Sequence, residues 1–256
     1  MPTALITGAT AGIGAAFAEQ LAARGHDLVT VARDATRLQQ QADALRLAYR
    51  VDVEALPADL STAHGRQAVS TRLAERDRPI DLLINNAGFT TAQRFVGGDL
   101  QAENDALDVM VRAVMELSHA ALGPMVERDQ GALITVSSIA GWIPGGTYSA
   151  AKAWATSFTE GLATELEGTG VRAMALCPGY VHTEFHERAG IDMNGIPDAL
   201  WLDASRVVAD ALDDLEKGKR VSVPSPLYKG VRAGLHVVPV GLVRRISRAR
   251  RQIGTR

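Results

Sequence analysis

The stretch TGATAGIG, Thr7 to Gly14, stands between an apolar run, Ala4–Thr7, and a helix-patterned segment, Ala15–Arg24. Its glycines remove side chains where a backbone has to approach a ligand, and the helix that follows offers free N–H groups and the positive end of its dipole. Any tight strand-to-helix turn also favours glycine, so a plain structural turn is the alternative. The position at the first strand-to-helix junction favours a binding site for the pyrophosphate of a dinucleotide.

Short apolar runs alternate with helix-patterned segments along the rest of the chain. The runs are bounded by Gly, Asp or Pro, the pattern of strands that a parallel sheet buries on both faces. They are Ala4–Thr7, Leu28–Ala32, Val51–Leu56, Leu82–Asn85, Ala132–Ser137, Val171–Cys177 and Val221–Val223. The helical segments include Ala15–Arg24, Thr36–Ala48, Ala102–Arg128 and Tyr148–Leu166. This alternation predicts an α/β fold, a single Rossmann-type doubly wound parallel sheet flanked by helices, with ligand sites at the carboxyl ends of the strands.

Composition excludes several classes of protein. The chain has 256 residues, 46% of them hydrophobic, which is enough for a large core without disulfides. The one cysteine, Cys177, cannot form an intramolecular disulfide, so we expect a reducing, cytoplasmic setting. A formal net charge of −2 gives no indication of nucleic-acid binding. The N-terminal MPTALIT lacks the basic region of a signal peptide, and no apolar run approaches the length of a membrane span.

The second expected strand ends in VTVARD, Val29 to Asp34. Sites for NAD usually carry an acid at this point, for the ribose 2′-hydroxyl, whereas sites for NADP carry an arginine for the 2′-phosphate. Arg33 follows the strand end, and a planar guanidinium suits a phosphate, although a solvated loop cation is the alternative. Asp34 is expected to be the N-cap of the next helix. We therefore predict that the cofactor is NADP(H).

Five further motifs follow the later strands in order. They are DL (Asp59, Leu60), NNAG (Asn85–Gly88), SSIAG (Ser137–Gly141), YSAAK (Tyr148–Lys152) and PGYVHT (Pro178–Thr183). Together with TGATAGIG, they resemble the motifs of the short-chain dehydrogenase/reductase family over about residues 3–223. A tyrosine four residues before a lysine is weak alone, and it is the conjunction of motifs that carries the resemblance.

The resemblance implies an enzyme, an oxidoreductase that interconverts a carbonyl and an alcohol on a small or apolar substrate, and a homodimer or homotetramer. It implies that Ser138 holds the substrate oxygen, that Tyr148 passes the proton, and that Lys152 grips the nicotinamide ribose and lowers the tyrosine pKa. The cofactor-binding residues that it implies are Gly8, Thr10, Ala11, Gly12, Ile13, Gly14, Arg33, Asp59, Leu60, Asn86, Ala87, Gly88, Tyr148, Lys152, Pro178, Gly179, Val181 and Thr183. Asp59 and Leu60 are expected at the adenine and the NAG residues along the groove. Pro178, Gly179 and Thr183 are expected at the nicotinamide end.

The residue types suit this chemistry. Reducing a carbonyl needs a hydride, which the cofactor carries, and a proton from an acid with a pKa near the working pH. A free tyrosine titrates near 10, and a neighbouring cation favours the phenolate. Positions i and i+4 share one face of a helix, so Tyr148 and Lys152 can both face a bound cofactor. Ser138 adds a short hydroxyl donor toward the developing alkoxide.

The sequence departs from the family pattern at one place. Family members usually carry an asparagine in the helix after the fourth strand, where it helps to hold a water that links the lysine to solvent. Met110, within DVMVRA, stands there instead, and a thioether is a poor hydrogen-bonding group. We expect an enzyme with a modified proton relay. A nucleotide-binding regulator with little turnover is the alternative, while the Tyr148–Lys152 pair argues against a Rossmann methyltransferase.

The expected domain covers residues 1–225 and includes a substrate lid at about residues 183–205. Trp142, Ile143 and Pro144 are expected to form one wall of the substrate site. The lid residues Phe185, Ile191, Met193, Ile196 and Trp201 suggest an apolar lining. His182 and His186 are four apart, but no third ligand stands at a recognisable spacing, so we expect no metal site.

A basic C-terminal extension, residues 226–256, follows the domain. From Lys217 to Arg256 there are 11 basic residues and no acidic one. The stretch His236–Arg251 is expected to form a basic amphipathic helix. Two interpretations stay open: weak peripheral contact with an anionic membrane surface, or packing against the domain or a second subunit.

Overall fold

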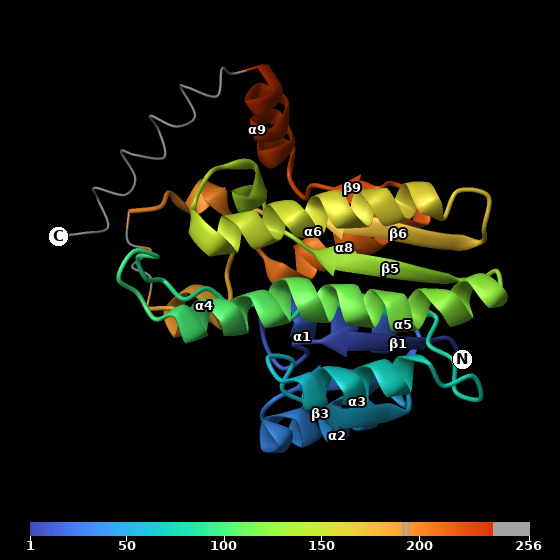
Figure 1. Ribbon diagram of the computed structural model, residues 1–256. Coiled ribbons are helices and arrows are strands. Elements are labelled where there is room, and N and C mark those ends of the chain that lie inside the picture. Colours follow the sequence, from blue (N-terminus) through green and yellow to red (C-terminus); the bar gives the residue numbers. More distant parts are fainter. Residues whose placement is uncertain (191–192, 194, 238–256) are drawn as a thin grey trace.

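The structure, a computed structural model, describes residues 1–190, 193 and 195–237. Within these residues, seven parallel strands form one sheet in the order β3-β2-β1-β4-β5-β6-β9 (Figure 1). The strands are β1 (Thr3–Thr7), β2 (Asp27–Ala32), β3 (Val53–Pro57), β4 (Leu82–Asn85), β5 (Gly131–Val136), β6 (Val171–Leu176) and β9 (Val221–Ser222). The order reverses between β1 and β4, so the predicted doubly wound parallel sheet is confirmed.

Helices cover both faces of the sheet. They are α1 (Gly12–Ala23), α2 (Ala35–Tyr49), α3 (Ala63–Leu73), α4 (Leu100–Leu107), α5 (Ala113–Glu127), α6 (Gly146–Glu165), α7 (Glu184–Arg188), α8 (Ala204–Glu216) and α9 (Pro226–Val237). In Figure 1, α3, α5 and α6 lie in front of the sheet and α1 and α8 behind it. Short polar side chains start several of them: Asp34 caps α2 by accepting a hydrogen bond from the Arg37 N–H, as expected, and Thr62 caps α3.

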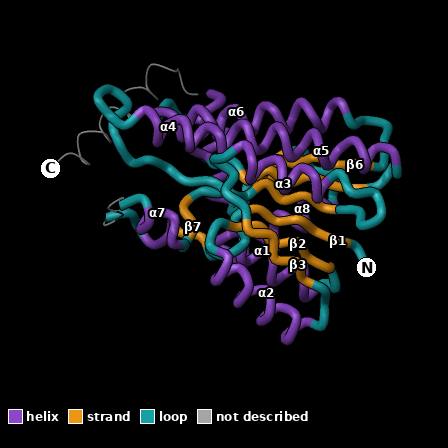
Figure 2. Tube along the Cα trace, turned by 60° about the horizontal axis from the view of Figure 1, so that its bottom comes forward, coloured by secondary structure: helices purple, strands orange, loops and turns teal. Residues whose placement is uncertain are grey.

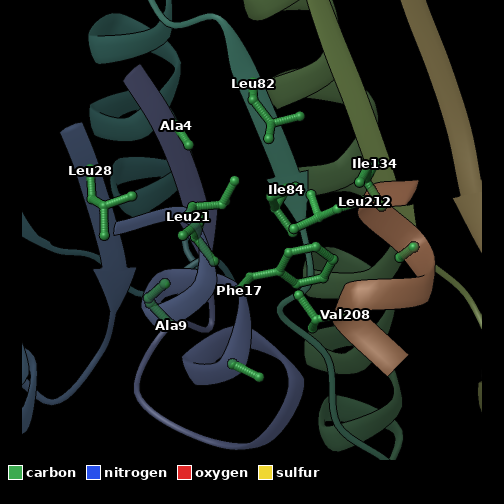
Figure 3. Close-up of a cluster of buried hydrophobic side chains, with 14 of the residues drawn as sticks. Ala4, Ala9, Phe17, Leu21, Leu28, Leu82, Ile84, Ile134, Val208 and Leu212 are labelled. Carbon is green, nitrogen blue, oxygen red and sulfur yellow. The ribbon is translucent and has the colours of Figure 1, made fainter. Parts of the chain in front are cut away.

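The strands bury side chains on both faces, which explains their unbroken apolar sequences. Ala4 and Ile6 of β1 face one hydrophobic cluster, built around Phe17 of α1 and Val208 of α8, whereas Leu5 faces the cluster under α3 and α5. Figure 3 shows Phe17 among side chains from β4, β5 and α8. Both faces of the sheet are therefore packed, and the place that remains for a ligand is the edge at which the strands end.

Two differences from the sequence prediction concern helix boundaries. Helix α1 begins at Gly12 and not at Ala15, so its first turn lies inside the glycine-rich motif and its free N–H groups face the loop. The predicted helix over Ala102–Arg128 is divided by a π-helical turn at Asp108–Arg112. This wider turn places Met110 in a small buried cluster with Ala106 and Ala151, under Phe89 and Tyr148.

A second, two-stranded sheet lies outside the main one. Its strands, β7 (Tyr180–Val181) and β8 (Trp201–Leu202), are parallel. Between them in the sequence lie α7 and a short 3₁₀ turn at Asp198–Leu200. Figure 2 shows β7, α7 and α4 at the end of the main sheet that lies away from the N-terminus. This is the end at which the parallel strands finish, so the expected lid region is placed beside the carboxyl ends of the strands.

The described fold continues beyond residue 225. Tyr228 of α9 is buried against Ala175, Cys177 and Val223. The predicted basic helix over His236–Arg251 lies, from residue 238 onward, outside the described residues. None of the described helices combines the length and apolar character that crossing a membrane requires.

Candidate active site

A cavity of about 1340 Å³ opens at the carboxyl ends of the strands. Pockets for single small molecules usually measure roughly 300–1,000 Å³, so this one has room for a dinucleotide together with a second ligand. All of the predicted site residues except Gly14 line it. The structure thus brings together residues that lie as far apart in the sequence as Gly8 and Thr183.

The glycine-rich loop forms one wall from backbone atoms. Gly12 has φ +53°, and a Cβ added there would lie 2.7 Å from Cγ2 of Thr183, so a side chain is excluded on two counts. Gly14, which is predicted to bind the cofactor, lies outside the cavity lining. A Cβ on Gly14 would lie 2.1 Å from the Gly8 carbonyl oxygen. Gly14 therefore lets α1 pack closely on the loop.

Asn86 braces the glycine-rich loop from β4. Its Nδ2 donates to the carbonyls of Thr7 at 2.8 Å and Gly8 at 3.2 Å. In return, the Thr7 hydroxyl accepts the backbone N–H groups of Asn86 at 2.9 Å and Ala87 at 3.0 Å. These bonds fix the loop conformation before any ligand arrives.

One end of the cavity carries polar and charged groups. Arg33 is exposed at the end of β2 and makes no ion pair within the described part of the chain. Asp59 is held in a turn, where its Oδ1 accepts from the Ser61 N–H at 3.0 Å and hydroxyl at 2.8 Å. Behind this turn, buried Arg66 donates to the carbonyls of Leu60 at 3.1 Å and Ser61 at 2.9 Å. Sequence reasoning missed Arg66, because an arginine on a helix normally predicts a solvated side chain.

An ion pair crosses from this end to α7. The Arg37 guanidinium, on α2, donates to both Glu184 oxygens, at 3.1 Å and 2.7 Å. The pair raises the pKa of Arg37, chiefly through the hydrogen bond to Glu184. It was also missed from the sequence, and the only available signal was the position of Arg37 one turn after Arg33.

Ser138, Tyr148 and Lys152 come together at the other end. The Ser138 hydroxyl, just after β5, is hydrogen-bonded to Tyr148 and accepts the Ala140 N–H at 3.1 Å. Lys152 follows Tyr148 by one turn of α6, and its Nζ lies 5.7 Å from the centroid of the phenol ring. The Nζ donates to the Val136 carbonyl at 2.7 Å, so the ammonium is tied to the last residue of β5.

Burial dominates the titration of this group. It raises the pKa of Tyr148 to about 12, against a smaller lowering by the Ser138 hydrogen bond. It also lowers the pKa of Lys152 to about 8, against a smaller rise from Cys177. The expected lowering of the tyrosine pKa by Lys152 is thus not seen in this structure. The ammonium is engaged by a backbone carbonyl, and its own charge is disfavoured by desolvation.

Two polar clusters that the sequence did not reveal hold α6 in place. The Ser137 hydroxyl lies 2.6 Å from the Lys152 carbonyl and 2.7 Å from the Thr156 hydroxyl, which fastens α6 to β5. At the start of α6, Thr147 is hydrogen-bonded to Glu103, a buried carboxylate on α4.

Glu103 also accepts hydrogen bonds from the Thr91 hydroxyl at 2.8 Å and the Gln93 amide at 2.9 Å. These bonds, with the one from Thr147 the largest influence, lower its pKa. The loop after β4 and the residue before Tyr148 are therefore tied to one anion.

The space around the serine and the tyrosine is apolar. Ile143 and Pro144 line it as expected, and the ring of Phe185 lies 5.6 Å from that of Tyr148. Of the other residues predicted to line this space, Met193 does so, whereas Trp142, Trp201 and Ile196 are not in the lining. Trp142 and Trp201 pack elsewhere, and Ile191 lies outside the described residues.

Trp201 stacks on His182, with ring centroids 4.6 Å apart. Within the ranges that the structure describes, no group of His, Cys, Asp and Glu side chains is arranged to hold a metal.

The arrangement suits a dinucleotide. One wall is backbone that Gly12 keeps free of side chains, the first turn of a helix faces it, and an exposed guanidinium stands at the far end. At the opposite end, a hydrogen-bonded hydroxyl and phenol lie beside apolar space. Such a site can polarise an oxygen and transfer a proton to or from it.

Comparison with known proteins identifies relatives over most of the chain. The family model for short chain dehydrogenases matches residues 2–194. Sulfoacetaldehyde reductase 2 from Chromohalobacter salexigens is 35% identical over 217 residues, which are 82% of this chain and 85% of that protein.

Two solved structures extend the comparison to three dimensions. A short-chain dehydrogenase from Sphingobium yanoikuyae, in complex with NADPH, is 36% identical and superposes with a TM-score of 0.84 over 93% of this chain and 96% of its own. The bulky-bulky ketone specific alcohol dehydrogenase from Comamonas testosteroni is 30% identical, with a TM-score of 0.79 over 93% and 95%.

Proposed function

The chain belongs to the short-chain dehydrogenase/reductase family, and we propose that it is an NADP(H)-dependent oxidoreductase that interconverts a carbonyl and an alcohol on an apolar, uncharged substrate. The observation that carries this proposal is the Ser138–Tyr148 hydrogen bond at the apolar end of a cavity large enough for a dinucleotide. When bound, the nicotinamide cofactor supplies or accepts the hydride. The chain itself handles the oxygen and the proton.

Ser138 and Tyr148 act on the substrate oxygen. In the direction of reduction, both hydroxyls donate hydrogen bonds to the carbonyl oxygen, and the phenol gives its proton as negative charge develops there. A phenol with a pKa of about 12 is protonated at neutral pH, which is the form that reduction requires. The reverse reaction needs the phenolate, so we expect oxidation of the alcohol to accelerate as the pH rises.

Lys152 supports this step from below the phenol. Its Nζ uses one donor on the Val136 carbonyl and keeps two for the ribose hydroxyls of a bound cofactor. Because burial lowers the pKa of Lys152 to about 8, the ammonium loses its proton at mildly alkaline pH. We expect cofactor binding through this residue to weaken above that pH.

The preference for NADP(H) rests on Arg33. Its exposed guanidinium lines the cavity at the end of β2, with no acidic side chain paired to it in the described residues. The Sphingobium yanoikuyae relative was solved with NADPH, which supports the same choice. The measurement is kcat/KM with NADPH and with NADH on one substrate, and a higher value with NADH would overturn the preference.

The substrate class follows from the lining near Tyr148. Of the described residues there, those outside the catalytic group carry no charge: Phe89, Thr90, Ile139, Ala140, Ile143, Pro144, Tyr180, Phe185, Ala189 and Met193. An anionic substrate would lose its hydration at this end without gaining a cationic partner among these described residues. We therefore propose a neutral ketone or aldehyde and not a sulfonate of the kind named for the Chromohalobacter salexigens relative. The ketone-specific Comamonas testosteroni relative supports this choice.

A nucleotide-binding regulator with little turnover is the second candidate. It is favoured by Met110, which is buried and lies against Gly88, close to Nζ of Lys152. A thioether at this point cannot hold a water that would return protons to the lysine. The two candidates make opposite predictions for turnover.

The deciding experiment follows NADPH oxidation against neutral aliphatic and aromatic ketones, aldehydes, quinones and sulfoacetaldehyde. We expect turnover of neutral ketones and a loss of kcat of at least about a hundredfold in Tyr148→Phe, the usual range for removing a general acid. Tyr49→Phe is the matched control, because Tyr49 lies on α2 outside the cavity lining and its hydroxyl donates a hydrogen bond to Glu19. Absence of turnover across the panel, with NADPH still bound, would favour the regulator.

We also propose a cytoplasmic homodimer or homotetramer. The half-buried rings of Trp154 and Phe158 stack on α6 at 4.6 Å, and Met115 of α5 is an exposed apolar residue. Burying these side chains between subunits would remove apolar surface from water. Light scattering after size-exclusion chromatography gives the mass directly, and a monomer at micromolar concentration would contradict this part of the proposal.

A further inference from the structure

We infer that Glu103, on helix α4, is a positioning residue for the proposed reaction, because its carboxylate fixes Tyr148 relative to the loop after β4 that lines the same cavity. The carboxylate bonds to Thr147, the residue before Tyr148, and to Thr91, which follows the lining residue Thr90. Two segments of the cavity wall are therefore held by one side chain that does not line the cavity itself. The inference rests on the proposed oxidoreductase function.

Glu103 is a carboxylate buried without a cation. It is 5% exposed and makes no ion pair in the part of the chain that the structure describes. Such a group needs hydrogen-bond donors that replace its lost hydration. The hydroxyls of Thr147 and Thr91 and the side-chain amide of Gln93 are these donors. They lower the pKa of Glu103, the bond from Thr147 most, so the carboxylate is charged at neutral pH and accepts from all three.

Helix α4 turns its buried face toward α6. Glu103 and Ala106 are the buried residues of α4, and they lie three positions apart, on one side of the helix. Ala106 packs against Ala151 of α6 and against Met110. These small side chains let α4 and α6 approach closely, and the approach brings the carboxylate of Glu103 to the start of α6.

The first turn of α6 lacks the groups that usually fix the start of a helix. Gly145 stands at its N-cap without a side-chain hydrogen bond, and the turn contains no acidic residue. Gly146, which follows, has φ +77°. Glu103 supplies from a neighbouring helix what this turn lacks, a hydrogen-bond acceptor for Thr147 and a negative charge near the helix N-terminus. Tyr148 lies in this turn, so its position depends on the same bond.

The other hydrogen bonds of the carboxylate hold the loop after β4. Thr91 and Gln93 both donate to Oε1 of Glu103, at 2.8 Å and 2.9 Å. Ala92, between them, has φ +51°, a backbone conformation that residues with a Cβ rarely adopt. The same loop passes the catalytic group at Gly88, where an added Cβ would lie 3.4 Å from Nζ of Lys152. A shift of this loop therefore changes the space beside the lysine and the tyrosine.

Thr147→Val tests the inference, because valine keeps the branched shape of threonine and lacks the hydroxyl. We expect kcat for carbonyl reduction to fall by about tenfold, since a displaced acid transfers its proton more slowly. The Kd of NADPH, measured by fluorescence titration, is expected to stay within about twofold, because the glycine-rich loop is not altered. Thr147→Ser keeps the hydroxyl and is expected to retain kcat within about twofold. Thr164→Val, the same change at an exposed position of α6, is the matched control.

A double-mutant cycle tests whether Glu103 is the partner through which Thr147 acts. In Glu103→Ala the threonine has already lost its acceptor, so adding Thr147→Val is expected to lower kcat by less than about twofold more. A further tenfold loss would contradict the inference. If Glu103→Ala does not fold, the comparison of Thr147→Val with Thr147→Ser decides alone.

Thr91→Val removes a bond on the loop side of the carboxylate. We expect the KM of the carbonyl substrate to rise several-fold and kcat to stay within about twofold, because the loop moves while Thr147 still anchors Tyr148. A loss of kcat as large as that in Thr147→Val would contradict this division between the two sides of Glu103.

Hydrogen exchange tests the same bond without turnover. Residues 149–152 carry the first backbone N–H groups that are bonded within α6. We expect peptides that contain them to exchange several-fold faster in Thr147→Val than in the natural protein or in Thr164→Val, as followed by mass spectrometry.

Unchanged exchange would overturn the inference, as would a kcat of Thr147→Val within about twofold of the natural value or an equal loss in Thr147→Ser. If the natural protein reduces no carbonyl, the proposed function fails, while the exchange rates still decide whether Glu103 anchors the turn that carries Tyr148.

Discussion

Replacing Lys152 by methionine tests whether the buried charge of this lysine destabilises the folded protein through its desolvation. The side chain is 6% exposed, and no carboxylate contributes to its pKa; burial lowers that pKa from 10.5 to about 8. Methionine has a similar length without a charge. We expect Lys152→Met to inactivate the protein. At neutral pH we also expect it to stabilise the fold, because the variant no longer has the desolvation cost of a buried ammonium.

The magnitude follows from the pKa values. A fall from 10.5 to about 8 corresponds to roughly 3–4 kcal/mol at about 1.4 kcal/mol for each tenfold change in proton affinity. Below about pH 8 the lysine is charged in both states, and the folded state carries the whole cost. Between about pH 8 and 10.5 the folded protein has released this proton while the unfolded chain still binds it, so the stability of the natural protein rises with pH.

The methionine variant lacks this rise, so its advantage over the natural protein shrinks by about 2 kcal/mol between about pH 7 and pH 9.5. The variant also loses the hydrogen bond to the Val136 carbonyl, which changes its free energy of unfolding equally at the two pH values. The difference between the two pH values therefore reports the charge of Lys152 alone. Tyr148, with a pKa of about 12 in the folded protein, is present in both proteins, so its own titration cancels in the comparison.

The assay is urea unfolding at the two pH values, with Lys217→Met as an exposed control. A difference that stays constant with pH would refute the reasoning.

Three further substitutions test other parts of the site. Gly14→Ala places a Cβ 2.1 Å from the Gly8 carbonyl oxygen, so we expect the free energy of unfolding in urea to fall by about 2–4 kcal/mol and NADPH to bind more weakly. Gly161→Ala, in open space on α6, is the control and is expected to stabilise the protein by about 0.5–1 kcal/mol. Equal effects of the two substitutions would contradict this account. Arg33→Ala is expected to lower kcat/KM with NADPH by about 10–100-fold and to leave NADH nearly unchanged, and a parallel loss with both cofactors would argue for a structural role of Arg33. Met110→Asn restores an amide beside Lys152, and we expect kcat to change by less than about tenfold; a much larger gain would show that the natural relay is impaired and not merely modified.

The sheet was predictable because its strands are buried on both faces. Such strands have continuous apolar sequences ending in Gly, Asp or Pro, and residues 82–85 form β4 as predicted. The π-helical turn was not predictable, because its hydrophobic spacing resembles that of an uninterrupted helix. The two-residue strands β7 and β8 are too short to leave a periodic signal.

The candidate site divides in the same way. Arg33 was predicted from its position at the end of a long strand, and Ser138, which also follows a strand, was predicted from the family resemblance of its motif. Residues that support them could not be predicted in this way, because Arg66 and Glu103 act through contacts that include partners distant in the sequence, such as Glu116 and Thr147. Their burial as polar side chains is visible only in three dimensions. The raised pKa of Tyr148 likewise depends on packing around the phenol and not on the spacing to Lys152.

The cavity reaches from the end of β2, at Arg33, to the end of β6, at Pro178, and so spans both sides of the point where the strand order reverses. A molecule that occupies its full length contacts segments from both halves of the chain, so its complete site exists only in the folded protein. Its free energy of binding then adds to that of folding, by about 2.7 kcal/mol at a ligand concentration a hundred times Kd. The melting temperature of the protein consequently reports which dinucleotide it holds, before any substrate has been found.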